Sequence, residues 1–138
     1  MSGFIQSNQI VKLPYANTAI NIADSGKIFI TPQTVGAAAV IYTLPTVAEG
    51  LHYRFINGAN LPLSGSVQIN TNAAVAILNG SVIGGPISGV ALLAVIANPQ
   101  IRFLTAKSVQ GDFIDLTCDG TNWYVDGRSQ VGGGITVT

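Results

Sequence analysis

Apolar and polar residues alternate in short runs along most of this chain, and the clearest run lies between residues 111 and 127. Ile114, Leu116 and Cys118 alternate with outward-facing neighbours, which is the period of two expected for a half-buried strand. The following stretch 119–122 (Asp-Gly-Thr-Asn) favours a turn, because Asp and Asn tolerate left-handed backbone and Gly takes positive φ without steric cost. Residues 123–125 return as a second strand, so the sequence predicts an antiparallel hairpin with its indole in the core. The residues that define this signature hairpin are Gly111, Asp112, Asp119, Gly120, Asn122, Trp123 and Tyr124.

The rest of the chain repeats this short period, with turn residues about every eight to twelve positions. Further strands are expected over residues 9–13, 18–22, 27–31, 40–44, 51–56, 67–69, 92–96, 101–105 and 135–138. Helical periodicity does not extend beyond about two turns anywhere. The pattern therefore predicts an all-β fold, a single antiparallel β-sandwich or jelly-roll-like domain. The expected core residues are Ile28, Ile30, Leu44, Tyr53, Phe55, Leu116, Trp123 and Val125.

The domain organisation follows from the ends of the chain. Residues 1–8 are polar and irregular and are expected to form an N-terminal arm, followed by one sandwich domain over residues 9–131. Residues 132–138 combine three glycines with an apolar run, and predict a flexible tail with a possible edge strand. We expect this tail and the arm to reach neighbouring subunits, and removal of the tail to leave the fold intact.

Charged residues are few. They make up 9% of the 138 residues and sum to a net charge of zero, whereas about 25% is usual in soluble domains. No charged residue lies between Arg54 and Arg102. Because charge keeps proteins apart in solution and is depleted at interface cores, this predicts a surface covered by other subunits. The alternative is a neutral surface of Ser, Thr, Asn and Gln. The candidate interface residues are Tyr15, Tyr42, Ile135 and Val137.

The same composition gives no indication of a nucleic-acid or membrane partner. Cys118 is the single cysteine, so an intrachain disulfide is excluded and its thiol is expected to act as a small buried apolar group. The start of the chain lacks the basic and apolar regions of a signal peptide. The apolar region 73–97 is interrupted by glycines and is too short between them to span a membrane.

Candidate catalytic and metal-binding residues are sparse. His52 is the single histidine and has no Cys, His or Asp at ligand spacing, which favours a surface position. Asp115 and Asp126 are expected to point outward from one hairpin, where a carboxylate pair could serve a glycosidase, but the sequence gives no sign of a sugar cleft. Asp119 belongs to the turn and is expected to bind local backbone amides. The sequence therefore predicts no catalytic, metal or cofactor site, and a protein that is not an enzyme.

Several stretches taken in order resemble β-rich structural modules of virus particles, namely tailed-phage fibre and head-decoration proteins and capsid-associated proteins of large DNA viruses. The stretches that carry the resemblance are 23–27 (Ala-Asp-Ser-Gly-Lys), 42–45 (Tyr-Thr-Leu-Pro), 49–56 (Glu-Gly-Leu-His-Tyr-Arg-Phe-Ile), 111–112 and 119–125. The resemblance implies a virion component, commonly a homotrimer, that is made in the host cytoplasm and binds itself and other capsid proteins. It carries over no catalytic or receptor-binding residue.

The first functional hypothesis is a minor capsid, cement or decoration subunit that acts through subunit–subunit contacts. The alternative is a receptor- or carbohydrate-binding module of a viral fibre tip, in which loops such as residues 57–65 would contact a glycan receptor. The enzyme hypothesis has Asp115 and Asp126 as its candidates.

Overall fold

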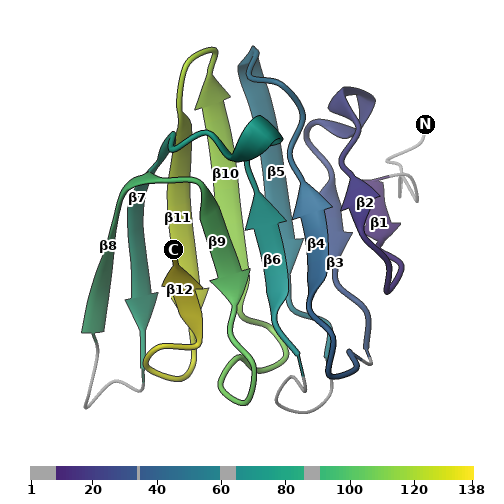
Figure 1. Cartoon of the computed structure of the whole chain (residues 1–138), viewed down its shortest axis with the longest axis vertical. Coiled ribbons are helices and arrows are strands. Elements are labelled where there is room, and N and C mark those ends of the chain that lie inside the picture. The colour runs from purple at the N-terminus through teal and green to yellow at the C-terminus, as the bar shows by residue number, and fades with distance from the viewer. Residues whose placement is uncertain (1–8, 34, 60–64, 86–90) are drawn as a thin grey trace, which may run out of the picture.

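The chain folds as two β-sheets packed face to face (Figure 1). The computed structural model describes residues 9–33, 35–59, 65–85 and 91–138. The large sheet has seven strands in the order β1 (Ile10–Lys12), β3 (Ile28–Ile30), β5 (Glu49–Ile56), β10 (Phe113–Asp119), β11 (Trp123–Ser129), β7 (Leu78–Gly84) and β8 (Ala91–Asn98). The small sheet has five strands in the order β12 (Ile135–Val137), β9 (Gln100–Phe103), β6 (Val67–Asn70), β4 (Val40–Thr43) and β2 (Thr18–Ala19). Short 3-10 helices lie at Ile22–Asp24 and Asn72–Ala74.

The predicted all-β sandwich is confirmed, but its sheets are mixed and not purely antiparallel. The pairs β1–β3, β3–β5, β2–β4, β4–β6 and β7–β11 are parallel. In the first half of the chain, successive strands alternate between the two sheets, with β1, β3 and β5 in one and β2, β4 and β6 in the other. The chain reverses direction each time it passes from one sheet to the other, so it returns to the first sheet running in its original direction. Strands such as β1 and β3, which are neighbours in the sheet, are therefore parallel.

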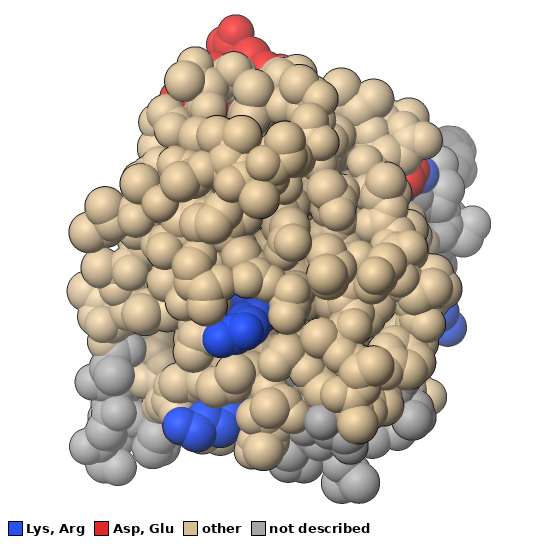
Figure 2. All heavy atoms as spheres, viewed as in Figure 1, with Lys and Arg blue, Asp and Glu red and all other residues tan. Residues whose placement is uncertain are grey.

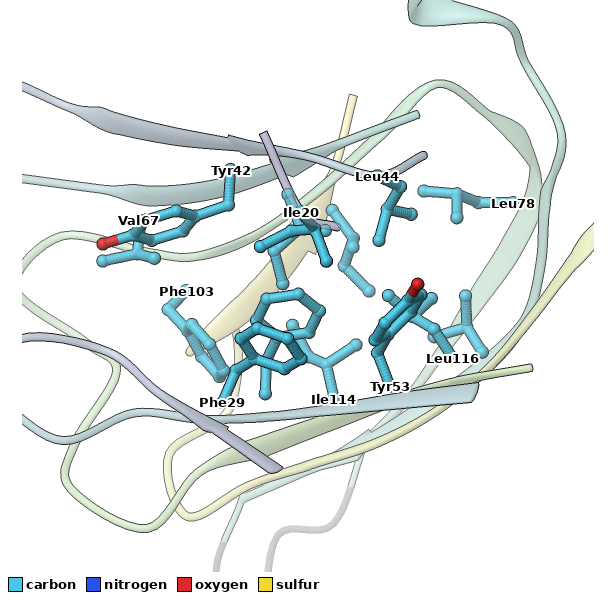
Figure 3. Packing of buried hydrophobic residues seen from close by; sticks show 14 of the residues in the cluster. Ile20, Phe29, Tyr42, Leu44, Tyr53, Val67, Leu78, Phe103, Ile114 and Leu116 are labelled. Carbon is cyan, nitrogen blue, oxygen red and sulfur yellow. The ribbon is translucent and has the colours of Figure 1, made fainter. Parts of the chain in front are cut away.

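The core lies between the sheets and is rich in aromatic rings (Figure 3). Phe29 stacks on Phe55 with ring centroids 5.2 Å apart, and Tyr53 lies 5.7 Å from Phe29 and 5.9 Å from Trp123. Such pairs add to the free energy gained from burying the rings. The expected core residues Leu44, Tyr53, Phe55, Leu116, Trp123 and Val125 are all buried.

The prediction that Ile28 and Ile30 of β3 are core residues is wrong by one position. Phe29 is the buried residue, whereas Ile28 and Ile30 are half-buried on the other side of the strand. Phe29 pairs with Phe55 of β5, which faces the core. Because successive side chains of a strand point to opposite faces, this pairing turns both isoleucines outward.

The prediction of an antiparallel hairpin is confirmed. Leu116 pairs with Val125 and Cys118 pairs with Trp123, and all four of these side chains are buried. The turn between the strands contains Gly120 at φ 95°, in the left-handed region that favours glycine.

The C-terminal segment forms the edge strand that the sequence predicted as possible, and its place in the fold corrects the expectation of a flexible tail. Strand β12 pairs with β9 at the edge of the small sheet, and Ile135 is 2% exposed. The Leu104 N–H donates to the Gly134 carbonyl at 2.8 Å. The expected N-terminal arm, residues 1–8, lies outside the described residues. Across the part of the chain that is described, no helix is long and apolar enough to cross a membrane.

Candidate functional site: polar clusters and the apolar edge of the sandwich

The signature hairpin is held by its turn carboxylate. Asp119 Oδ1 accepts hydrogen bonds from the backbone N–H groups of Thr121 and Asn122, each at 2.8 Å, and Oδ2 accepts one from the Tyr124 hydroxyl at 2.9 Å. The backbone bonds first, and then the phenol, lower the pKa of Asp119, and the same carboxylate raises the pKa of Tyr124. As expected from the sequence, Asp119 binds local amides, so its role here is to stabilise the turn.

A second cluster surrounds Asp112, which is 1% exposed. Its carboxylate accepts hydrogen bonds from the hydroxyls of Ser108 at 2.8 Å and Ser129 at 3.1 Å. It also accepts from the backbone N–H groups of Val109 at 3.0 Å and Gln130 at 2.9 Å. A buried carboxylate needs such donors to offset its lost hydration. The cluster therefore joins the segment before β10 to the end of β11.

The sequence identified Asp112 as part of the hairpin signature but gave no signal for its partners. Asn57 extends the cluster, because its amide donates to Ser108 Oγ at 2.9 Å. With Gly58 and Ala59, Asn57 is buried, although this loop was expected to contact glycans. That expectation is wrong for these three residues, and residues 60–64 of the loop lie outside the described part of the chain.

The outward-facing carboxylates lie side by side on the large sheet. Asp115 on β10 is the pairing partner of Asp126 on β11 and of Arg54 on the other neighbouring strand, β5. Arg54 donates to both carboxylate oxygens of Asp115, at 2.6 Å and 2.7 Å. The side chain of Asp115 is thus engaged in a two-point ion pair. His52 lies exposed in the same strand as Arg54, and no group of three or more potential metal ligands occurs among the described residues.

The four candidate interface residues fall into two groups. Tyr42 is fully buried, its hydroxyl donates to the Pro14 carbonyl at 2.7 Å, and burial raises its pKa. Ile135 is also a core residue. For these two the interface expectation is wrong, because their side chains fill the space between the sheets. Tyr15 is 44% exposed and Val137 is half-buried, and their contact with another subunit stays a prediction.

Sequence reasoning missed the most exposed apolar side chains. Leu92 and Ile96 on β8 are 70% and 74% exposed, and Ile83 on the neighbouring β7 is 43% exposed. Ile83 and Leu92 are directly paired, so they lie on the same face of the large sheet. The signal was present as the apolar run 90–97, but a strand that is apolar on both faces reads as a buried one.

The outer face of the small sheet is polar and nearly uncharged. Arg102 is the one charged residue among the strands of this sheet. Its Nε donates to Thr136 Oγ1 at 3.2 Å, and the amide of Gln100 donates to that of Gln68. Figure 2 shows this side of the molecule, on which charged side chains are few and most of the surface is uncharged. The sequence allowed either a surface covered by other subunits or a neutral polar surface. A neutral polar surface is present on this side of the molecule.

The chain matches no protein-family model, no curated protein and no solved structure in the three comparisons that were made.

Proposed function

We propose that this chain is a non-enzymatic structural subunit of a virus particle, in which it acts by binding further copies of itself and neighbouring capsid proteins. The virus assignment rests on the sequence resemblance described above. The proposal of self-association rests on a feature of the fold, the exposed apolar edge of the large sheet at β8.

Strand β8 combines the properties of a surface that other chains cover. It is the last strand of the large sheet, so one side of its backbone has no neighbouring strand among the described residues. Free edges of this kind pair readily with another chain. Soluble proteins usually protect such edges with lysine, proline or a bulge. The strand sequence Ala-Leu-Leu-Ala-Val-Ile-Ala-Asn contains neither a charged residue nor a proline, and its pairing with β7 is irregular only at the end, between Val95 and Asn98.

The exposed side chains supply the free energy of association. Burying a leucine or isoleucine side chain fully contributes about 1.5–3 kcal/mol. Leu92 and Ile96 are each more than two-thirds exposed. In a ring of subunits each contact would be repeated by symmetry. The low charge of the molecule leaves little electrostatic repulsion to oppose these contacts.

The solution mass of the purified chain, measured by light scattering, tests self-association. We expect a stable oligomer, with a trimer as the state implied by the resemblance. Leu92→Lys combined with Ile96→Lys places two charges on the apolar edge and should give the monomer mass. Ile22→Lys is the control, because Ile22 is an apolar residue that is 53% exposed in the 3-10 helix Ile22–Asp24, away from β8, and this variant should leave the oligomer unchanged. A wild-type monomer at high concentration contradicts self-association through this edge.

The virus assignment has a separate test. Mass spectrometry of purified virus particles from the same source should detect peptides of this chain. The amount of these peptides should follow that of the capsid proteins across a sedimentation gradient. If the oligomer forms but the chain stays out of the particles, self-association stands and the virion role is wrong.

A further inference from the structure

The outer face of the large sheet carries two rows of side chains that cross the strands from β3 to β8. Members of a row are neighbours in the register, and they alternate along each strand with residues that face the core. The first row consists of Ile30, Ile56, Phe113, Arg128, Ile83 and Leu92. The second row consists of Ile28, Arg54, Asp115, Asp126, Ser81 and Ala94.

The first row is apolar except for its arginine, although residues on the outer faces of a sandwich are normally polar. Ile83 is 43% and Leu92 is 70% exposed, and Ile56 and Phe113 are half-buried. Apolar side chains that are contiguous on a surface indicate a site where another molecule binds. The outer face of the large sheet therefore has apolar surface that association would bury.

Two charges of opposite sign identify what fits this face. Asp126 and Arg128 occupy successive outward positions of β11, one in each row, and both side chains are exposed. Neither belongs to the ion pairs formed by the described residues. Outward positions two residues apart on a strand are separated by about 7 Å. A second copy of the chain can pair with both charges at once, because residue i meets residue j, and j meets i, across a two-fold axis.

We propose that the outer face of the large sheet binds the same face of a second copy of this chain, with Asp126 of each copy opposite Arg128 of the other. A two-fold axis that runs across the strands between the stacked sheets, level with Gly127, gives this arrangement and makes the two β11 strands antiparallel. The same axis brings Leu92 of one copy opposite Ala94 of the other, so a large side chain meets a small one. The arginine fork suits a carboxylate in such an interface.

This inference rests on the self-association proposed above and adds a second contact to it. Pairing at the β8 edge extends the large sheet sideways, whereas the face contact stacks two sheets. The trimer implied by the resemblance concerns the edge, and a two-fold contact doubles such a ring. Leu92 contributes to both contacts, so a lysine there disrupts both. Asp126 and Arg128 report on the face alone.

Charge reversal tests the face contact. Asp126→Arg leaves two positive charges on the outer face of β11, and Arg128→Asp leaves two negative charges. In each variant alone, like charges of two copies oppose each other, and we expect light scattering to give half of the wild-type mass. Both side chains are exposed, so neither substitution should unfold the single chain.

An equimolar mixture of the two variants should regain the wild-type mass, because both opposed pairs of charges are then attractive. Isotope labelling of one variant lets native mass spectrometry count the pairs that contain one chain of each kind. Glu49→Arg and Lys107→Asp are the matched controls, since they change the net charge by the same amounts at exposed positions outside both rows. Each control alone should keep the wild-type mass.

Single reversals that keep the wild-type mass, or a mixture that stays dissociated, overturn the face contact and leave the edge contact standing. Ile96→Lys tests the edge separately, because Ile96 lies on β8 outside both rows and is 74% exposed. If Ile96→Lys keeps the wild-type mass while the single reversals halve it, the edge contact is wrong and the face contact stands. A wild-type chain that is a monomer at high concentration overturns both contacts.

Discussion

Arg54 and Asp115 are 61 positions apart in the sequence and form a two-point ion pair between β5 and β10. The guanidinium also lies 4.7 Å from the centroid of the Phe113 ring, at a distance that permits a cation–π interaction. The hydrogen bond that Arg54 donates to Asp115 raises the pKa of the guanidinium, so the arginine remains charged. This pair holds two central strands of the large sheet in register on the outer face, where no core packing acts.

A double-mutant cycle measures this pair. Arg54→Met removes the charged planar fork that matches a carboxylate and keeps an unbranched side chain. With Asp115→Asn as the second substitution, we expect a coupling free energy of about 1 kcal/mol in urea unfolding, near the upper end for partly exposed pairs. A coupling near zero would show that solvent screens the pair completely.

Asp112 should be far more important for stability than the exposed aspartates. Asp112→Ala leaves the Ser108 hydroxyl and the backbone N–H groups of Val109 and Gln130 without their acceptor, whereas the Ser129 hydroxyl keeps the Val131 carbonyl at 2.8 Å. Each buried unsatisfied donor costs about 1–3 kcal/mol, and we expect a total loss of about 3 kcal/mol or more in the free energy of unfolding. Asp126→Ala, at an exposed position, is the control and should change it by less than about 0.5 kcal/mol. Equal effects of the two substitutions would contradict the importance of the cluster.

The hairpin turn should respond to acid. Because Asp119 has a folded-state pKa below its ordinary value of about 3.9, its stabilising contribution is present above about pH 4. This contribution is lost as the pH falls through the folded-state pKa. The folded-state pKa of Asp119 can be measured directly by following the chemical shift of its carboxyl carbon by NMR as the pH is varied.

Tyr124→Phe provides the comparison for this titration. The variant removes one of the three hydrogen bonds to the carboxylate and keeps the two from the backbone. We expect the pKa of Asp119 to rise in this variant and to remain below its ordinary value, because the backbone bonds have the larger effect. Identical titration curves in the two proteins would exclude the tyrosine as a partner in solution.

The C-terminal strand should be required for the fold, contrary to what the glycines suggest. Ile135→Ala removes a side chain that is 2% exposed, and we expect a loss of about 2–5 kcal/mol in the free energy of unfolding. Val137→Ala, in the same strand at a half-buried position, should cost less. Deletion of residues 132–138 should destabilise the domain by more than either substitution in thermal unfolding. If the protein without residues 132–138 is as stable as the full chain, the segment is a tail and not a required part of the fold.

Elements whose signals are local could be predicted from the amino-acid sequence. Alternation and turn residues placed the hairpin, with Trp123 inside and Tyr124 outside, because a polar residue between apolar ones indicates which face is buried. The low charge follows from composition, and the lack of metal-ligand spacing around His52 follows from the order of the residues.

Three features depend on contacts in the folded protein: which face of the Ile28–Ile30 strand is buried, where Tyr42 lies and which strand forms the exposed edge. In Ile28-Phe29-Ile30 every residue is apolar, so alternation carries no information and the pairing of Phe29 with Phe55 sets the orientation. Tyr42 has both a ring that favours burial and a hydroxyl that favours water, and the Pro14 carbonyl in a distant segment satisfies the hydroxyl inside. The partners of Asp112 and the open edge at β8 likewise depend on which segments meet in space, because burial and pairing are set by contacts between residues far apart in the chain.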